Sequence, residues 1–485
     1  MACAAAACGQ TGCCRDEDDE ELVVSTKKKA GKPIIKTNSV STDTASSNRS
    51  DSTQAYSSEG SGHRQSLCVK CKIDEALIGD ESRVCFGCFR SSLFGKFKVT
   101  VTTQDLISPP DNVLVAFSGG PSSRVALQFI HELQQKAQRN LDASRDKSFP
   151  VFGVGIAFID ESAISSIPSH EFEQAIQDVR LIVSSLAPPA KELYIAPIGD
   201  IFSLDSDDGI ERLKELLCAI SDVTGKEDLL RHLRMISLQK IASGHGYNKV
   251  VLGSCASRIA CHVISATVKG QGYSLPADIQ YVDARWEVPV VLPLRDCLIQ
   301  ELKMLCHHES LKTLELLDGP HSGINGLVSS FVTLLQEENP SREPTIVRTA
   351  EKLTPFNFNR LPETNDSSNH SSFRRRHKKL NFESYESNPS EYFCPICNSP
   401  IKNSDLESLK SILGHSETTA DIFGASCCSS CQFQILPKEP STMEHFYSLL
   451  PKPMVARVRD GICSNQDWLR EQIKDCLLSD DEEGI

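Results

Sequence analysis

Short apolar runs alternate with amphipathic segments through the middle of the 485-residue chain, and this alternation predicts its fold. The runs that are typical of buried strands are Val113–Phe117, Val151–Phe158, Leu193–Ile198, Val250–Gly253 and Val288–Leu292. The segments with helical spacing between them are Arg124–Ala137, Glu171–Leu186, Ile210–Val223 and Glu227–Ser243. Continuous apolar strands separated by helices indicate a parallel sheet that is covered on both faces. We therefore expect an α/β domain with helices on both faces of a parallel sheet.

Changes of composition mark the boundaries of this domain. Residues 1–65 and 361–390 are rich in small polar and charged residues, and they carry too little apolar surface to fold. Cysteine pairs lie on either side of the α/β part. The expected organisation is a disordered tail at 1–65, a cysteine module at 66–95, the α/β domain at 96–345, a disordered basic insert at 361–390, a second cysteine module at 391–450 and a helical tail with an acidic end at 451–485.

The net charge of -13 is concentrated in two short runs. Asp16–Glu21 holds six negative charges and Asp480–Glu483 holds four, so the rest of the chain is close to neutral. Overall charge therefore does not exclude a local surface for nucleic acid. No apolar run approaches the roughly 18 residues of a membrane span, and the N-terminal stretch lacks the basic leader of a signal peptide. We expect a cytoplasmic protein without membrane contact.

The chain contains 20 cysteines, and eight of them form two modules of paired CxxC motifs. The spacings are Cys68-x2-Cys71-x13-Cys85-x2-Cys88 and Cys394-x2-Cys397-x30-Cys428-x2-Cys431. We expect each CxxC pair to present two thiolates from one tight turn. In a reducing compartment, two such turns that face each other favour a closed tetrahedral site for structural zinc. Free thiols on loops and an iron–sulfur cluster stay as alternatives. In the second module, Cys427 competes with Cys428 for the fourth ligand position.

A glycine-containing loop follows the first predicted strand and precedes a helix. It consists of Ser118, Gly119, Gly120, Pro121, Ser122 and Ser123. Glycines let the backbone approach a phosphate, and the amides at the start of the helix point toward it. The sequence thus suggests a phosphate-binding loop, with a tight strand-to-helix turn that binds nothing as the alternative.

This SGGPSS loop resembles the SGGxDS loop of the PP-loop ATP pyrophosphatases, which adenylate a carbonyl before a nucleophile displaces AMP. Four-cysteine modules on both sides of such a core are similar to those of the tRNA 2-thiolation enzymes. The phrases EYFCPICNSPI at 391–401 and CCSSCQFQIL at 427–436 resemble the cytoplasmic tRNA 2-thiolation protein 2 family. The resemblance covers about residues 67–450 apart from the insert. It implies a degenerate PP-loop domain flanked by two small zinc-ribbon-like modules and disordered tails.

The chain departs from the active members of that group at the positions that carry chemistry. Ser122 stands where their loop has an aspartate, and 253–258 (GSCASR) stands where they have a GHNxDD-type motif with two acids. Glu227–Leu230 and Gly319–Pro320 occupy the regions of their sulfur-carrying cysteines. We interpret the remaining core cysteines as buried small apolar residues: Cys255, Cys261, Cys297 and Cys306.

The resemblance therefore implies a non-catalytic subunit of a heterodimer that thiolates C2 of the wobble uridine U34, in mcm5s2U formation, in the tRNAs for Lys, Glu and Gln. A related catalytic subunit would bind ATP, and a thiocarboxylated ubiquitin-related modifier would donate sulfur. An independently active tRNA sulfurtransferase and a zinc-ribbon scaffold without tRNA contact are the alternatives. Candidate tRNA contacts, unless they form only a solvated basic patch, are Arg374, Arg375, Arg376, Lys378 and Lys379.

Overall fold

The computed structural model describes residues 67–77, 83–143, 150–202, 208–314, 322–359, 392–402 and 418–458. The predicted tail at 1–65, the insert at 361–390 with the basic run Arg374–Lys379, and both acidic runs lie outside the described residues. The predictions about these segments stay predictions.

A single six-stranded sheet forms the centre of the described chain, with the strand order β3-β2-β1-β4-β6-β5. The strands are β1 Asn112–Ala116, β2 Gly153–Asp160, β3 Glu192–Pro197, β4 Lys249–Val251, β5 Val282–Asp283 and β6 Val290–Val291. All neighbours pair in parallel except β5 and β6. The five predicted strands are all present, so the parallel sheet is confirmed. The antiparallel edge strand β5 has only two residues, too few to produce a recognisable apolar run.

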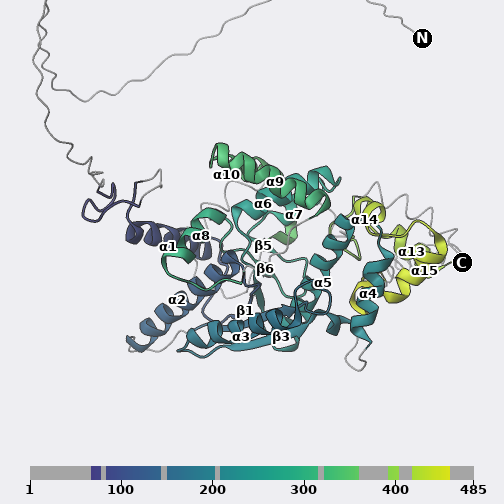
Figure 1. Ribbon diagram of the computed structural model, residues 1–485, viewed down its shortest axis with the longest axis horizontal. Coiled ribbons are helices and arrows are strands. Elements are labelled where there is room, and N and C mark those ends of the chain that lie inside the picture. The colour runs from purple at the N-terminus through teal and green to yellow at the C-terminus, as the bar shows by residue number, and fades with distance from the viewer. Residues whose placement is uncertain are drawn as a thin grey trace, which may run out of the picture. The chain divides into compact units, whose positions relative to one another are not determined.

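Helices cover both faces of the sheet, as the sequence predicts (Figure 1). They are α1 Phe86–Thr103, α2 Pro121–Ala143, α3 Ser169–Ser185, η1 Ile198–Ile201, α4 Gly209–Ala219, α5 Val223–Gly244, α6 Ala256–Val268, α7 Leu275–Asp278, α8 Ile299–His308, α9 Gly323–Glu338, α10 Arg342–Ala350, η3 Asn357–Asn359, α13 Thr419–Ala425, α14 Ser429–Gln434 and α15 Pro440–Leu449. Successive strand residues point to opposite faces. Val113 and Val115 pack with α1, α2, α3 and α8, whereas Leu114 packs with α5, α6, α9 and α10.

The helix α1 connects the N-terminal cysteine module to this core. It runs without a break through residue 95, where we expected the module and the domain to divide. Leu93 and Phe97 are fully buried, and the Phe94 ring meets Phe129 of α2 edge to face at 5.1 Å. Arg90 forms ion pairs with acidic side chains that follow α8 and lie in α2. The module is therefore attached to the sheet domain by one rigid helix.

The C-terminal cysteine module shares a hydrophobic core with α4 and α5. Fully buried side chains from both parts belong to one hydrophobic cluster, among them Leu213, Leu233, Ile396 and Phe423. Figure 1 shows α13, α14 and α15 beside α4 and α5. Because the two parts bury a common apolar surface, neither can lose its packing without exposing the other.

We predict that Phe423→Ala destabilises the C-terminal module and the α4–α5 region together, by about 3–5 kcal/mol. Phe423 is fully buried in the shared core, and truncation leaves a cavity there. Thermal unfolding followed by circular dichroism and by metal release measures both parts at once. Phe433→Ala is the matched control, because its side chain is 75% exposed and its loss should cost less than about 0.5 kcal/mol. Two separate transitions in Phe423→Ala would contradict a shared core.

Candidate functional site

The first cysteine pair of each module lies in a tight turn closed by the same backbone hydrogen bonds. In the N-terminal module, Lys72 N–H donates to the Cys68 carbonyl at 2.9 Å, and Cys68 N–H donates to the Asp74 carbonyl at 2.8 Å. Asn398 N–H donates to the Cys394 carbonyl at 2.8 Å in the C-terminal module. Lys72 and Asn398 have φ values of 57° and 58°, so both turns use the left-handed region. The two turns are thus built alike.

The second cysteine pair of each module lies at the start of a helix. Cys85 is the N-cap of α1 with Cys88 in its first turn, and Cys428 is the N-cap of α14 with Cys431 in its first turn. We expected a second tight turn at both places. A helix start achieves the same convergence because positions i and i+3 lie on one face.

The four sulfur atoms of each module converge to within 4.8 Å of one another, and this geometry fits one metal ion. A tetrahedral ion with Zn–S bonds of about 2.3 Å separates its sulfurs by about 3.8 Å. The Cys71 and Cys85 sulfurs are 3.7 Å apart, and those of Cys397 and Cys428 are 3.6 Å apart. Four thiolates leave no open ligand position, so such a centre would be structural.

One thiol in each module already favours the charged form. Burial alone raises the pKa of the Cys68 thiol, but backbone hydrogen bonds from Cys71, Cys85 and Lys70 lower it to about 6. The pKa of Cys394 also lies well below its ordinary value, because hydrogen bonds from the neighbouring thiols outweigh burial. Both modules therefore hold a ready ligand for a cation.

Cys427 stands outside the second group of ligands. Its sulfur donates to the Phe423 carbonyl at 3.3 Å, and burial raises its pKa well above the ordinary value. Cys428 completes the group instead. The geometry thus answers the question that the adjacent cysteines left open.

Arg457 is a neighbour of the second centre that the sequence did not reveal. Its guanidinium donates to the Pro395 carbonyl at 3.1 Å and lies 5.0 Å from the Trp286 ring. Burial lowers the pKa of Arg457, and the nearby thiolates Cys394 and Cys397 raise it. This cation offsets part of the negative charge of four thiolates. No motif in the sequence indicates Arg457, because it lies 26 residues after Cys431, the last cysteine of the module.

The glycine loop lies between β1 and α2 as predicted, and its polar groups mostly satisfy one another. The Ser123 hydroxyl accepts from Ser118 N–H at 3.3 Å and donates to the Gly120 carbonyl at 2.9 Å. Ser122 is buried and its hydroxyl donates to the Cys255 sulfur at 3.7 Å. The loop side chains are therefore engaged within the protein.

Leu314 packs directly against the loop. Its N–H donates to the Gly119 carbonyl at 2.9 Å, and a Cβ added at Gly119 would lie 2.7 Å from the Leu314 Cβ. Gly119 has a φ of +84°, which favours glycine independently of any ligand. The loop thus keeps the backbone form of a phosphate loop while an apolar side chain covers one of its glycines.

The stretch 253–258 lies against the same loop, as the resemblance implies. A Cβ at Gly253 would lie 2.7 Å from the Ser123 nitrogen, so only glycine allows this approach. The Ser257 hydroxyl, at a position that the resemblance aligns with an acid, donates to buried Glu343 of α10 at 2.6 Å. This position therefore connects helices here and does not face an open site.

The segment that the resemblance aligns with sulfur-carrying cysteines holds a buried ion pair. Asp228 pairs with Lys269 at 2.7 Å, and Asn325 of α9 donates to Asp228 and accepts from Lys269. Glu227 accepts from Ser322 at the start of α9. The network joins α5, α6 and α9. The aligned region Gly319–Pro320 lies outside the described residues.

The remaining core cysteines are packing residues in the structure. Cys255, Cys297 and Cys306 are buried among apolar side chains, and burial raises the pKa of Cys306 and Cys261 to about 11. A thiol with such a pKa is a poor nucleophile and a poor metal ligand near neutral pH.

These features define the class: an α/β protein with a mostly parallel sheet, a glycine loop after its first strand and two four-cysteine modules. The comparisons with known proteins give the family. The chain is 56% identical over 431 residues to cytoplasmic tRNA 2-thiolation protein 2 of Arabidopsis thaliana, covering 88% of this chain and 94% of the relative. The corresponding protein of Homo sapiens is 25% identical, over 60% of this chain and 68% of its own. The chain belongs to the cytoplasmic tRNA 2-thiolation protein 2 family, whose model matches residues 323–423.

A solved structure is also similar to this chain. The U34-tRNA thiolase NcsA from Methanococcus maripaludis with its [4Fe-4S] cluster matches with a TM-score of 0.45 and 15% identity, over 60% of this chain and 90% of that one. Among the helices of the described residues, we find none with the length and apolar character to cross a membrane.

We predict that Cys394→Ser lowers the metal content of the purified protein by one ion per chain, whereas Cys427→Ser leaves it unchanged. Only Cys394 belongs to a converging group of four sulfurs. Atomic absorption of the purified variants measures the metal and identifies it as zinc or iron. Equal loss in both variants would contradict the assignment of ligands.

We predict that Lys269→Met destabilises the fold by about 3–5 kcal/mol at pH 7, because it leaves the buried Asp228 carboxylate without its nearer cation and with only Arg231 at 3.5 Å. Lys312→Met is the control: the Lys312–Asp178 pair has the same 2.7 Å distance, but the lysine is 57% exposed. Its loss should cost less than about 1 kcal/mol.

We predict that the loss of folding free energy caused by Lys269→Met becomes smaller as the pH falls from 7 to 5. Burial raises the pKa of Asp228, and the charges of Lys269 and Arg231 bring it below its ordinary value. Without Lys269, the pKa of Asp228 rises, so the folded variant takes up a proton at a higher pH than the wild type does. This proton uptake offsets part of the lost stability. Denaturant unfolding at both pH values measures the difference. A deficit that grows on acidification would show that Asp228 is not the group responsible.

Proposed function

We propose that this chain is the non-catalytic subunit of a heterodimeric complex that thiolates C2 of the wobble uridine U34, in mcm5s2U formation, in the tRNAs for Lys, Glu and Gln. The family to which the chain belongs supports a role in tRNA 2-thiolation. The name of these relatives supports the cytoplasm as its location.

The observation that carries the non-catalytic role is the conversion of the reactive positions into packing contacts. The Ser122 hydroxyl donates a hydrogen bond to the Cys255 sulfur, and the Ser257 hydroxyl donates one to Glu343. Leu314 packs over Gly119. Magnesium requires hard oxygen ligands, and the loop offers no carboxylate for it. ATP would then be bound by the related catalytic subunit, and sulfur would reach that subunit from a thiocarboxylated ubiquitin-related modifier.

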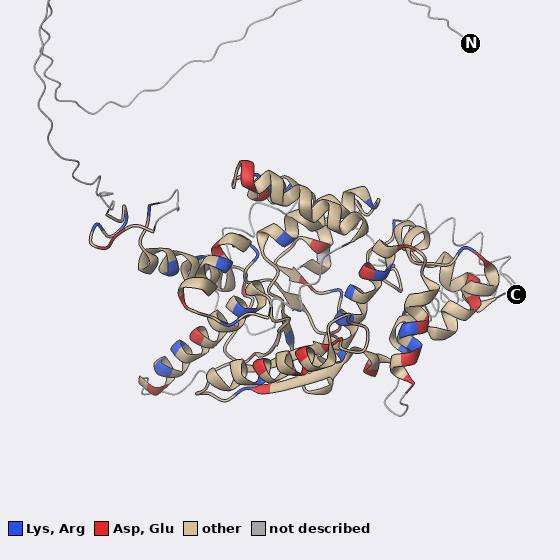
Figure 2. Ribbon diagram, in the orientation of Figure 1, with Lys and Arg blue, Asp and Glu red and all other residues tan. Residues whose placement is uncertain are grey.

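The residues of this chain would hold and orient the other components. Its two cysteine centres would each bind zinc and fix the shape of a tRNA surface that is recognised through phosphates and helix geometry. Acidic and basic side chains are interspersed over the described elements, so the contact would be local (Figure 2). Arg374, Arg375, Arg376, Lys378 and Lys379 are proposed additional phosphate contacts.

We predict that Ser122→Ala keeps tRNA thiolation within about twofold of the wild type when the chain is supplied with its catalytic partner. The Ser122 hydroxyl makes only a long contact to a sulfur, so its loss removes little. Gly253→Ala is the structural counterpart, because its Cβ collides with the backbone at Ser123. That variant should lose thermal stability and thiolation together.

The fraction of thiolated tRNA is measured on gels that retard it. The assay compares the chain alone, the partner alone and the mixture of both. Activity only in the mixture is the expected result. Turnover by the isolated chain would support an independently active sulfurtransferase. If the partner alone binds tRNA and thiolates it as well as the mixture does, this result would support the alternative of a scaffold without tRNA contact.

A further inference from the structure

The N-terminal cysteine centre has a carboxylate at its edge. The Oδ2 atom of Asp74 lies 3.4 Å from the Cys85 sulfur and 3.8 Å from the Cys71 sulfur. These two sulfurs are 3.7 Å apart, so the oxygen lies over the edge of the sulfur group that they form. Among the described side chains, no basic group forms an ion pair with Asp74. The polar contacts of this carboxylate are thus two metal-binding thiols.

The backbone of the first turn holds Asp74 in this position. Cys68 N–H donates to the Asp74 carbonyl at 2.8 Å and closes the turn, and Leu67 and Glu75 form a β-bridge on either side of it. Asp74 itself is exposed to solvent. The turn that presents the first two thiols therefore also carries the carboxylate to them.

The C-terminal module has a serine at the corresponding place. Its turn is closed in the same way, because Cys394 N–H donates to the Ser399 carbonyl at 2.8 Å. Ser399 is therefore the counterpart of Asp74. The charged side chain that we find beside the C-terminal centre is the cation of Arg457, as described above. The two centres thus have neighbours of opposite charge.

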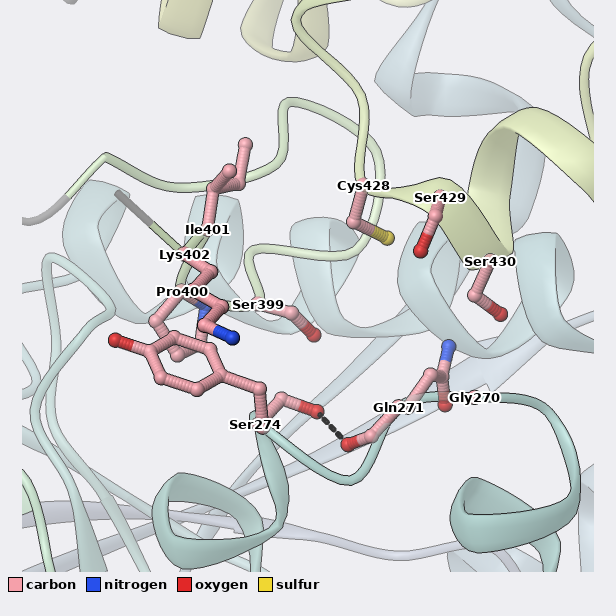
Figure 3. Close-up of a pocket in the computed structure, with 11 residues that line it drawn as sticks. Gly270, Gln271, Ser274, Ser399, Pro400, Ile401, Lys402, Cys428, Ser429 and Ser430 are labelled. Atoms are coloured by element: carbon pink, nitrogen blue, oxygen red, sulfur yellow. Dashed lines mark hydrogen bonds between the residues drawn. The ribbon is translucent and has the colours of Figure 1, made fainter. Parts of the chain in front are cut away.

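The more accessible thiols of the two centres also have different surroundings. In the N-terminal centre, Cys71 and Cys88 are partly exposed, and Asp74 contacts the first of them. In the C-terminal centre, the partly exposed ligand is Cys428. It lines a cavity of about 190 Å³, together with Ser399 (Figure 3), between the segments 270–274, 399–402 and 428–430. None of the 11 lining residues is acidic, so the lining offers no carboxylate that could replace the thiolate.

The balance of charge explains why Asp74 stays outside an intact centre and why it can enter an incomplete one. Four thiolates already exceed the charge of a divalent ion, so a fifth anion is repelled while all four are bound. Zinc binds aspartate oxygen as well as thiolate sulfur. When one thiolate leaves, a carboxylate in contact with it restores both the fourth ligand and the negative charge.

We propose that Asp74 is a reserve ligand of the N-terminal centre, which binds the metal ion when Cys71 or Cys85 is lost as a ligand. In this exchange, the bond from the ion to the thiolate sulfur breaks, a bond to Asp74 Oδ2 forms, and the released thiolate takes a proton from water. The inference rests on one part of the proposed function, namely that each cysteine module holds a metal ion. The N-terminal module would keep its ion and its shape after the loss of one of these two thiolates.

The test compares Cys71→Ala with Cys88→Ala in the full-length chain. Both cysteines are partly exposed, but Asp74 contacts only Cys71, and alanine offers no ligand atom. Zinc affinity is measured by competition with a chromophoric chelator without oxygen, and the ion of the C-terminal centre serves as the internal reference. Cys88→Ala should bind its N-terminal ion at least about tenfold more weakly than Cys71→Ala does, because no carboxylate replaces the lost thiolate.

Asp74→Ser gives the N-terminal turn the residue of its C-terminal counterpart. Alone it should leave the zinc affinity equal or higher, because four thiolates remain and a repelled anion is gone. Added to Cys71→Ala, it should lower the affinity at least about tenfold. Glu75→Ser added to Cys71→Ala is the matched control: it removes the next exposed acid in the sequence, and it should change the affinity by less than about twofold because exposed charges are screened.

Equal zinc affinity of Cys71→Ala and Cys88→Ala would overturn the proposal, and so would an effect of Asp74→Ser no larger than that of Glu75→Ser. Weaker zinc binding by Asp74→Ser alone would overturn it as well, because Asp74 would then support the intact centre. A wild-type chain without metal in its N-terminal module would instead refute the part of the proposed function on which the inference rests. Circular dichroism confirms that each variant is folded.

Discussion

The hydrophobic core that the C-terminal cysteine module shares with α4 and α5 is the contact on which the arrangement of the described chain depends. Cys394 and Cys431 are buried in it beside leucines of both helices. Arg285 reinforces it, donating to the Asn398 carbonyl at 3.2 Å while it pairs with Asp278 and Asp283. A module with so few residues cannot bury a stable core alone. Docking on the α/β domain supplies the missing apolar surface.

The two cysteine modules show how the same ligand geometry can serve different ends. In the N-terminal module, Leu67, Val69 and Ile73 are exposed, and α1 connects the module to the sheet domain. In the C-terminal module, the corresponding turn is covered, with Ile396 fully buried and Ile401 nearly so. Metal would therefore organise a projecting surface in one case and a shared core in the other. A defect in the second must reach the domain, whereas a defect in the first need not.

Much of the fold could be predicted because the signals are local. Each long apolar run forms a strand, and the two CxxC pairs of each module bring their sulfur atoms together as their spacing predicts. The sequence could not reveal contacts between distant segments, such as Leu314 on Gly119 or Lys269 on Asp228. It also placed the second cysteine pair of each module in a turn, because nothing in the CxxC pattern distinguishes a turn from the first turn of a helix. The cavity lies between three separate segments, so no single stretch of sequence contains its signature.

The positions that the resemblance aligns with catalytic groups of the active thiolases make structural contacts in this chain, and this bears on the proposed non-catalytic role. A lost catalytic group can leave an open site that a substitution might restore. Here Ser257 connects α6 to α10, and Glu227 with Asp228 connects α5 to α9. Restoring an acid at Ser257 would place a second carboxylate beside Glu343, whose pKa burial already raises. Two acids in that enclosed space would compete for one proton. The proposed non-catalytic role would thus be built into the packing of the helices, and introducing catalytic groups would require the surrounding contacts to change as well.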